Sequence, residues 1–145
     1  MVDELYQRAV LAHNRAPRRF GRLAHPTHAA ERANARCGDR LRCELDVRDG
    51  RIEDLRFDGE ACAVAIAAAS MLSDLACGTD AQEVETLARR LRARWDGAGD
   101  DAALGELNAL AVLARFPERR HCAELPFAAI AAALDSPAAA ENAPA

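Results

Sequence analysis

Apolar and polar residues alternate between residues 41 and 47, which is the pattern of a β-strand with one buried face. Asp49-Gly50 follows this strand, and a second, less regular apolar run extends from Ile52 to Phe57. An Asp-Gly pair between two such runs is a strong hairpin signal, because these residues tolerate the positive φ angles of a tight turn. The pattern therefore predicts an antiparallel hairpin, after which Asp58-Gly59-Glu60 turns the chain out of the second strand.

Apolar residues recur every three or four positions elsewhere, which predicts helices. The first expected helix covers residues 3–15, with Asp3 as its cap and Pro17 as its stop, and the second covers residues 62–77 and is closed by Gly78. A third begins at Thr79, which forms a capping box with Gln82, and extends to about Trp95. The stripe Leu104, Leu107, Ala111 and Ala114 predicts a fourth helix, and the last extends from Cys122 to Leu134. Residues 17–36 are rich in arginine and follow neither period. We predict that they form a long, mobile surface segment.

The chain has 145 residues, which is enough for one domain with its own core and too few for two ordinary domains. Only 4% of the residues are aromatic and 35 are alanine, a composition typical of closely packed helices. We expect a single domain over residues 1–135. Residues 136–145 are small and include proline, and they are predicted to form a disordered tail.

The charged residues exclude several classes of function. Nineteen arginines and no lysine oppose 23 acidic residues, so the net charge is −4, whereas a nucleic-acid-binding surface normally needs a basic balance. The lack of lysine excludes Schiff-base lysines and the phosphate-loop lysine. No apolar run reaches the roughly 18–20 residues of a membrane span, and the acidic start is unlike a signal peptide. We expect a cytoplasmic protein that binds neither nucleic acid nor membrane.

Five cysteines are an odd number, and in a reducing compartment they are better interpreted as thiols or metal ligands than as disulfides. Cys37, Cys62 and Cys122 each lie at the end of a predicted element, where side chains from separate segments can converge. Cys43 lies on the inward face of the first strand and is predicted to be a core residue. Cys77 is fifteen residues from Cys62 on one helix, or roughly 22 Å, so the two cannot share an ion.

Zinc bound by Cys37, Asp39, Cys62 and Cys122 would have three thiolates and one weaker oxygen ligand. His121 is the alternative fourth ligand in place of Asp39, and an iron–sulfur cluster could use the same thiolates. The other candidates have plainer interpretations. We expect His13 at a helix surface or core edge, His25 and His28 in solvent or against a partner, Trp95 in the core, and the arginines of residues 15–22 on a solvated face or docked to an acidic partner.

Four segments together resemble the U-type iron–sulfur cluster assembly family, that is, the SufU, IscU and N-terminal NifU group. They are Leu5-Tyr6 with His13; Cys37-Gly38-Asp39-Arg40; the run from Phe57 to Cys62 leading to Ala69-Ser70-Met71; and Phe116-Pro117 leading to Cys122-Ala123. The resemblance covers Leu5 to about Leu134. The sixty-residue separation of Cys62 and Cys122 is similar to that of the SufU branch, in which an insertion precedes the third cysteine. The Leu104 to Ala114 stripe fits that insertion.

The resemblance implies an α+β fold in which a small antiparallel sheet of about three strands packs against a cluster of helices. It also implies that Cys37, Asp39, Cys62 and Cys122 are zinc or cluster ligands. By the same resemblance Cys37 accepts persulfide sulfur from a cysteine desulfurase after leaving the zinc, and Arg119 lies close by and favours the anionic persulfide. Three departures are Ala61, where the family often has glycine; His121, as in the IscU branch; and Pro117–Arg120 in place of the chaperone-binding Leu-Pro-Pro-Val-Lys segment.

Three functions remain open at this point. The first is a zinc-dependent sulfur relay that acts with a SufS-type cysteine desulfurase, a sulfurtransferase in the enzymatic sense. The second is a non-enzymatic scaffold for a nascent [2Fe-2S] cluster. The third is an adaptor in which zinc is purely structural. In each case the expected partners are the desulfurase and downstream iron–sulfur assembly proteins, and the chain is expected to be a monomer or a weak dimer.

Overall fold

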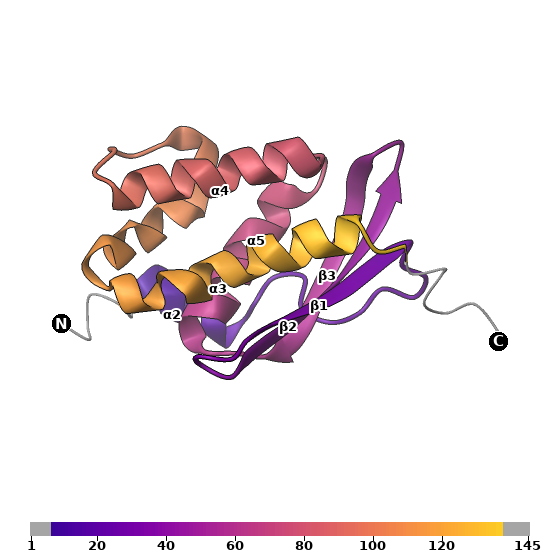
Figure 1. The fold of residues 1–145 in the computed structure, drawn as a ribbon, viewed down its shortest axis with the longest axis horizontal. Helices are drawn as coiled ribbons and strands as arrows, with labels where there is room; N and C mark the ends of the chain where they lie inside the picture. The colour runs from indigo at the N-terminus through magenta and orange to yellow at the C-terminus, as the bar shows by residue number, and fades with distance from the viewer. Residues whose placement is uncertain (1–6, 138–145) are drawn as a thin grey trace.

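The computed structural model describes residues 7–137, which form a three-stranded antiparallel sheet with helices packed against one face (Figure 1). The strand order is β1-β2-β3, with β1 at His28–Asn34, β2 at Asp39–Arg48 and β3 at Arg51–Glu60. Helix α5 crosses β1 and β2, and α3 packs against both α5 and β3. This arrangement confirms the predicted α+β class.

The predicted hairpin is present as β2 and β3. Asp49 and Gly50 both have positive φ angles, of 53° and 78°, as a two-residue hairpin turn requires. The second strand is longer than predicted, because Asp58-Gly59-Glu60 continues β3 instead of turning away from it. Glu60 pairs with Arg40, and this pairing places the end of β3 beside the start of β2.

The prediction of a mobile segment over residues 17–36 is wrong. Its last part is strand β1, in which only Ala29 is fully buried and most other side chains are polar, so the strand lacks an alternating pattern. Its first part is held by hydrogen bonds. The Phe57 carbonyl accepts the Gly21 N–H at 2.8 Å, and the Glu44 carboxylate accepts the Leu23 N–H at 2.8 Å.

Helix α2 spans Arg8–Arg15, α3 spans Ala63–Ala76 and α4 spans Ala81–Trp95. The predicted helix start at Asp3 lies outside the described residues. Helix α3 is buried around most of its circumference, as its alanine-rich sequence predicts. The N-cap of α4 is Asp80, not Thr79, because the Asp80 carboxylate accepts the Glu83 N–H at 2.9 Å. The Thr79 hydroxyl instead donates to the Ala76 carbonyl.

The Leu104 to Ala114 stripe belongs to a 3₁₀ helix, η1, at Ala102–Arg115, which is interrupted at Gly105. A 3₁₀ helix has three residues per turn, so its buried face consists of Leu104, Leu107, Leu110 and Leu113. Ala111 and Ala114, which the α-helical period placed on that face, are not fully buried. A short turn, η2, at Pro117–Arg119 leads into α5 at Arg120–Leu134.

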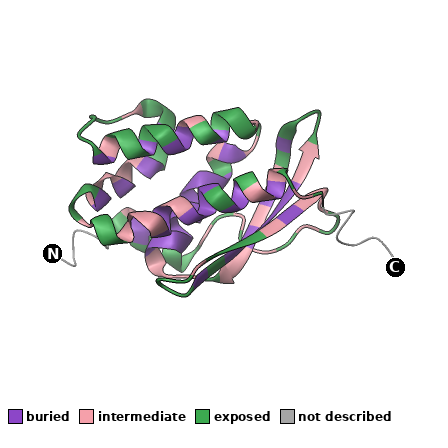
Figure 2. Cartoon of the chain, viewed as in Figure 1, coloured by how far each residue is buried: buried purple, intermediate pink, exposed green. Residues whose placement is uncertain are grey.

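The core lies between the sheet and the helices and among the helices, and the buried residues are coloured purple in Figure 2. Helices α2 and α3 pack together, and α4 packs against η1 and α5 on the side away from the sheet. The start of the predicted tail is paired: the Ser136 carbonyl accepts the Ala29 N–H at 3.0 Å, and Pro137 bridges to His28. Residues 138–145 lie outside the described part. No helix within the described residues has the length and apolar character needed to span a membrane.

Candidate metal centre

Cys37 lies in the short connection between β1 and β2, where one residue, Asn34, binds three successive N–H groups. The Asn34 backbone carbonyl accepts from Cys37 at 3.3 Å and from Gly38 at 2.8 Å, and its side-chain Oδ1 accepts from Arg36 at 3.2 Å. Gly38 has a φ of 73°, a left-handed conformation that suits glycine. This turn presents the Cys37 side chain to solvent.

Asp39 is the first residue of β2, and its carboxylate is buried. One oxygen, Oδ1, accepts the Cys62 N–H at 2.8 Å, so Asp39 links the start of the sheet to the start of α3. The other oxygen, Oδ2, is buried without a hydrogen-bond partner among the described residues. A buried carboxylate oxygen in this position is costly unless a ligand or a cation satisfies it.

Cys62 is the N-cap residue of α3 and is half-buried. The hydrogen bond with the Cys122 side chain lowers the pKa of Cys62 most; burial opposes this, and the backbone N–H groups of Ala65 and Val64 lower it further, to about 6. Helix N-termini stabilise thiolates in this way. The same contact with Cys62, together with burial, raises the pKa of Cys122. Of this pair, Cys62 is therefore the thiol that ionises more readily.

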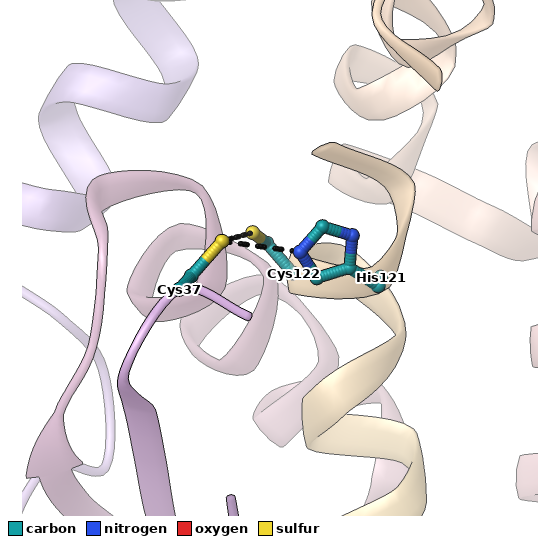
Figure 3. Close-up of side chains that lie close together, drawn as sticks. All are labelled: Cys37, His121 and Cys122. Carbon is teal, nitrogen blue, oxygen red and sulfur yellow. Dashed lines mark hydrogen bonds between the residues drawn. The ribbon is translucent and has the colours of Figure 1, made fainter. Parts of the chain in front are cut away.

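Cys122 and His121 lie in the first turn of α5 and face Cys37 (Figure 3). The Cys37 sulfur is 3.1 Å from His121 Nε2 and 3.8 Å from the Cys122 sulfur. Cys122 is fully buried, His121 is partly buried and Cys37 is exposed. The β1–β2 loop therefore lies over the N-terminal turn of α5, with Cys37 on the solvent side.

Two overlapping groups of potential ligands share Cys122. Within Cys37, His121 and Cys122, and within Asp39, Cys62 and Cys122, all ligand atoms lie within 4.8 Å of one another. Tetrahedral zinc with Zn–S bonds of about 2.3 Å separates two thiolate sulfurs by about 3.8 Å, which is the separation of Cys37 and Cys122. The unpartnered Oδ2 of Asp39 and the thiols are donors of the kinds that a divalent cation such as zinc binds, and each candidate fourth ligand belongs to one of the two groups.

The structure separates the other cysteines and histidines from this centre. Cys43 is buried in the core, as predicted, and desolvation raises the pKa of its thiol to about 12. Cys77 follows α3 at the end opposite Cys62 and belongs to neither group. His25 and His28 are also in neither group. His13 is more buried than a surface position would allow, and its ring nitrogens contact Ser70 Oγ at 2.6 Å and Glu106 Oε2 at 2.9 Å.

Three of the arginines of residues 15–22 pair with acidic groups of the same chain. Arg18 contacts Asp74 and Glu106, Arg19 contacts Asp54 and Asp74, and Arg22 contacts Asp58 and Glu44. These ion pairs attach the segment to α3, β2, β3 and η1. The paired side chains of Arg18 and Arg22 are 49% and 60% exposed, so they form a solvated charged face, and docking to an acidic partner stays a prediction.

Arg119 ends η2 and is the N-cap residue of α5, three positions before Cys122. The next residue, Arg120, was missed in the sequence analysis, and so was Asn34. Arg120 donates to backbone carbonyl groups and Asn34 accepts backbone N–H groups. Contacts of this kind leave no signal in residue spacing or composition. The only sequence signal for either was its position within three residues of a candidate ligand.

The comparisons with known proteins agree with this geometry. A family model, the NifU-like N terminal domain, matches residues 5–123. The zinc-dependent sulfurtransferase SufU of Bacillus subtilis (strain 168) is 30% identical over 131 residues, covering 89% of this chain and 88% of the relative. The iron–sulfur cluster assembly scaffold protein IscU of Streptococcus pyogenes serotype M1 is 30% identical over 143 residues, covering 97% and 89%.

A solved structure shows the same fold at lower identity. The N-terminal NifU-like protein of Brucella abortus superposes with a TM-score of 0.83 at 22% identity, over 92% of this chain and 94% of that one. The family model extends from before α2 to the first turn of α5, so it includes all five residues of the candidate centre. The chain belongs to the NifU-like N-terminal domain family, of the IscU/SufU type.

Proposed function

We propose that the protein serves iron–sulfur cluster assembly as a zinc-bound acceptor that takes persulfide sulfur from a cysteine desulfurase. The observation that carries this proposal is the unequal exposure of the centre. Cys37 is open to solvent, whereas Asp39 and Cys122 are buried and Cys62 is half-buried. A partner protein can therefore reach one sulfur while the other groups stay in place. The relative named as a zinc-dependent sulfurtransferase supports the same function.

We assign the ligand positions to Cys37, Asp39, Cys62 and Cys122, because Asp39 Oδ2 is buried and unpartnered. Zinc, when bound, favours the thiolate form of the cysteines that hold it and shields them from oxidation. His121 is then the group beside the Cys37 sulfur, at 3.1 Å from its Nε2. An N–H at this nitrogen can donate to an anionic sulfur on Cys37, and the charge of Arg119 favours the same anion.

The transfer itself is a thiol–disulfide-type exchange. The Cys37 thiolate attacks the outer sulfur of the persulfide on the desulfurase cysteine. A new S–S bond forms at Cys37, the S–S bond of the donor breaks, and its electron pair leaves with the desulfurase thiolate. The product is a Cys37 persulfide, and no external oxidant or reductant is consumed.

Cys37→Ser tests this proposal. The variant should no longer stimulate cysteine desulfurase turnover, because a hydroxyl at this position is a poor acceptor of sulfane sulfur. Cys77→Ser is the matched control, since Cys77 is half-buried at the other end of α3, and it should keep the stimulation. Mass spectrometry of the unsubstituted protein should find one added sulfur atom on the peptide that contains Cys37. Full stimulation by Cys37→Ser would overturn the proposal.

A scaffold for a [2Fe-2S] cluster is the second candidate, and the same donor set favours it. Thiolates with one exchangeable aspartate or histidine can hold a cluster and release it, and another relative is named as a scaffold. Anaerobic reconstitution with iron and sulfide separates the two functions. A stable visible chromophore that replaces zinc supports the scaffold, whereas zinc that resists replacement supports the sulfur relay.

A further inference from the structure

The first turn of α5 carries Cys122 and His121 but has no capping side chain. Its N-cap is Arg119, which has an α-helical backbone conformation and makes no side-chain capping hydrogen bond. Capping groups normally satisfy the free N–H groups of a helix start and fix its direction. The preceding turn η2 supports this start, since the Pro117 carbonyl accepts the Arg120 N–H, and a side-chain contact to another element would fix its direction toward the β1–β2 loop.

Arg120, the residue directly before His121, makes that contact. Its Nε donates to the Leu113 carbonyl at 3.0 Å, and its Nη2 donates to the Ala114 carbonyl at 2.9 Å. Both carbonyls lie in the last turn of η1. Two donors on one planar group that bind two neighbouring acceptors fix orientation as well as distance. The first turn of α5 is thus attached to an element that carries none of the candidate ligands.

A second contact holds the same guanidinium from α4. The Arg120 Cζ atom lies 5.6 Å from the centre of the Trp95 ring, a cation–π arrangement. Trp95 is itself fixed, because it is buried and its Nε1 donates to the Leu110 carbonyl of η1 at 2.9 Å. Arg120, Trp95 and the end of η1 therefore form a seat for the start of α5.

We propose that Arg120 is a positioning residue that holds Cys122 and His121 in register with Cys37, Asp39 and Cys62. The inference rests on the metal centre in the proposed function. It gives residues 102–115 a role, because the carbonyl groups of η1 orient the turn of α5 that carries Cys122 and His121. Arg120 does not need to touch the metal or the persulfide to have this effect.

The chain offers a matched control for this proposal. Arg92 of α4 also ties α4 to α5, since its Nε and Nη2 both bind Glu124 Oε1, at 2.8 and 2.6 Å. Glu124 lies only two residues after Cys122, but this ion pair is at the surface and does not reach η1. Arg92→Leu thus removes a contact between helices without removing the seat.

The test uses the two buried cysteines as reporters in the full-length protein after chelation. Alkylation in native buffer is followed by mass spectrometry at Cys122 and at Cys43, which reports global opening because it lies in the core. Arg120→Leu should speed alkylation of Cys122 by about tenfold or more, the range expected for lost charged hydrogen bonds, and leave Cys43 unchanged. Arg120→Lys should give a smaller increase, because it keeps the charge but not the fork. Arg92→Leu should change neither site.

Zinc affinity gives a second measurement by competition with a chromophoric chelator. Arg120→Leu should weaken Zn²⁺ binding about 10- to 100-fold, as the loss of a supporting group typically does, and Arg92→Leu should not.

The proposal is overturned if Arg120→Leu leaves Cys122 alkylation unchanged, raises Cys43 alkylation equally, or matches Arg92→Leu. If Arg120→Leu does not fold, Arg120→Lys decides by the same ratio of Cys122 to Cys43. An unsubstituted protein that binds no zinc would contradict the proposed function, whereas the alkylation ratio would still test Arg120.

Discussion

The five cysteines of this chain have the same side chain but different surroundings, and these surroundings divide them into different roles. Cys62 at a helix start has a pKa lowered to about 6, and Cys43 in the core has a pKa raised to about 12. Position relative to the predicted elements singled out Cys37, Cys62 and Cys122 as candidates, because element ends bring distant segments together, and each of the three belongs to a possible metal-binding group. The lack of a partner at Asp39 Oδ2 and the contacts of the Arg120 guanidinium both depend on packing. Neither feature could therefore be predicted from the sequence.

Cys43 should make stability fall at alkaline pH. Its pKa is raised in the folded state, so the native protein retains this proton between about pH 9 and 12 while the unfolded chain loses it. The stability linked to this proton is complete below pH 9 and is lost as pH rises. Between pH 9 and 11 the free energy of unfolding should fall faster in the unsubstituted protein than in Cys43→Ala, by up to about 1.4 kcal/mol per pH unit. Urea titrations of both proteins measure this, and parallel pH profiles would contradict it.

The strand hairpin was predicted well from its alternation, whereas the strand held by polar contacts and the helix with a three-residue period were not. The hairpin of β2 and β3 follows from alternation and an Asp-Gly turn, both local signals. Strand β1 buries only Ala29 completely and gains its place from pairing with β2, so its sequence resembles a loop. The buried leucines of η1 repeat every three residues. A helical period of 3.6 predicts the first two of these positions correctly and then places the buried face one residue too late.

Gly59 of β3 and Gly38 of the β1–β2 loop should differ sharply when each is changed to alanine. A Cβ on Gly59 would lie 2.0 Å from the Arg40 carbonyl oxygen, a backbone atom that cannot move without disturbing the β2–β3 pairing. A Cβ on Gly38 would meet no atom within 4 Å, so its cost is that of the left-handed conformation alone. Gly38→Ala should lower the free energy of unfolding by about 1–2 kcal/mol, and Gly59→Ala by about 3 kcal/mol or more. Urea denaturation compares them, and equal losses would show that the close approach at Gly59 relaxes easily.

At the scale of the whole molecule, the candidate centre and the core occupy different places. The candidate ligands come from the β1–β2 loop, the first residue of β2, the start of α3 and the start of α5, all at one end of the sheet. The core instead extends between the sheet and the full length of the helices (Figures 1 and 2). A chain of this length can bury enough surface to fold without a metal. The three-stranded sheet was predicted only through the family resemblance, because strand number depends on pairings that local patterns do not encode.

This separation predicts the result of removing the metal, which distinguishes a working centre from structural zinc. After chelation the full-length protein should keep its helical circular dichroism and unfold cooperatively, because the buried leucines and alanines of α3, η1 and α5 do not depend on the ligands. Zinc at a free concentration of about 100 Kd should then add only about 2.7 kcal/mol, by mass action on the folded state. Thermal melts before chelation, after chelation and after zinc is restored measure both quantities.

Loss of helical signal on chelation, with recovery on adding zinc, would instead make the ion part of the fold, as in small domains where it supplies about 10–16 kcal/mol. The exposed Cys37 would then be a structural ligand, and the adaptor function would replace the sulfur relay.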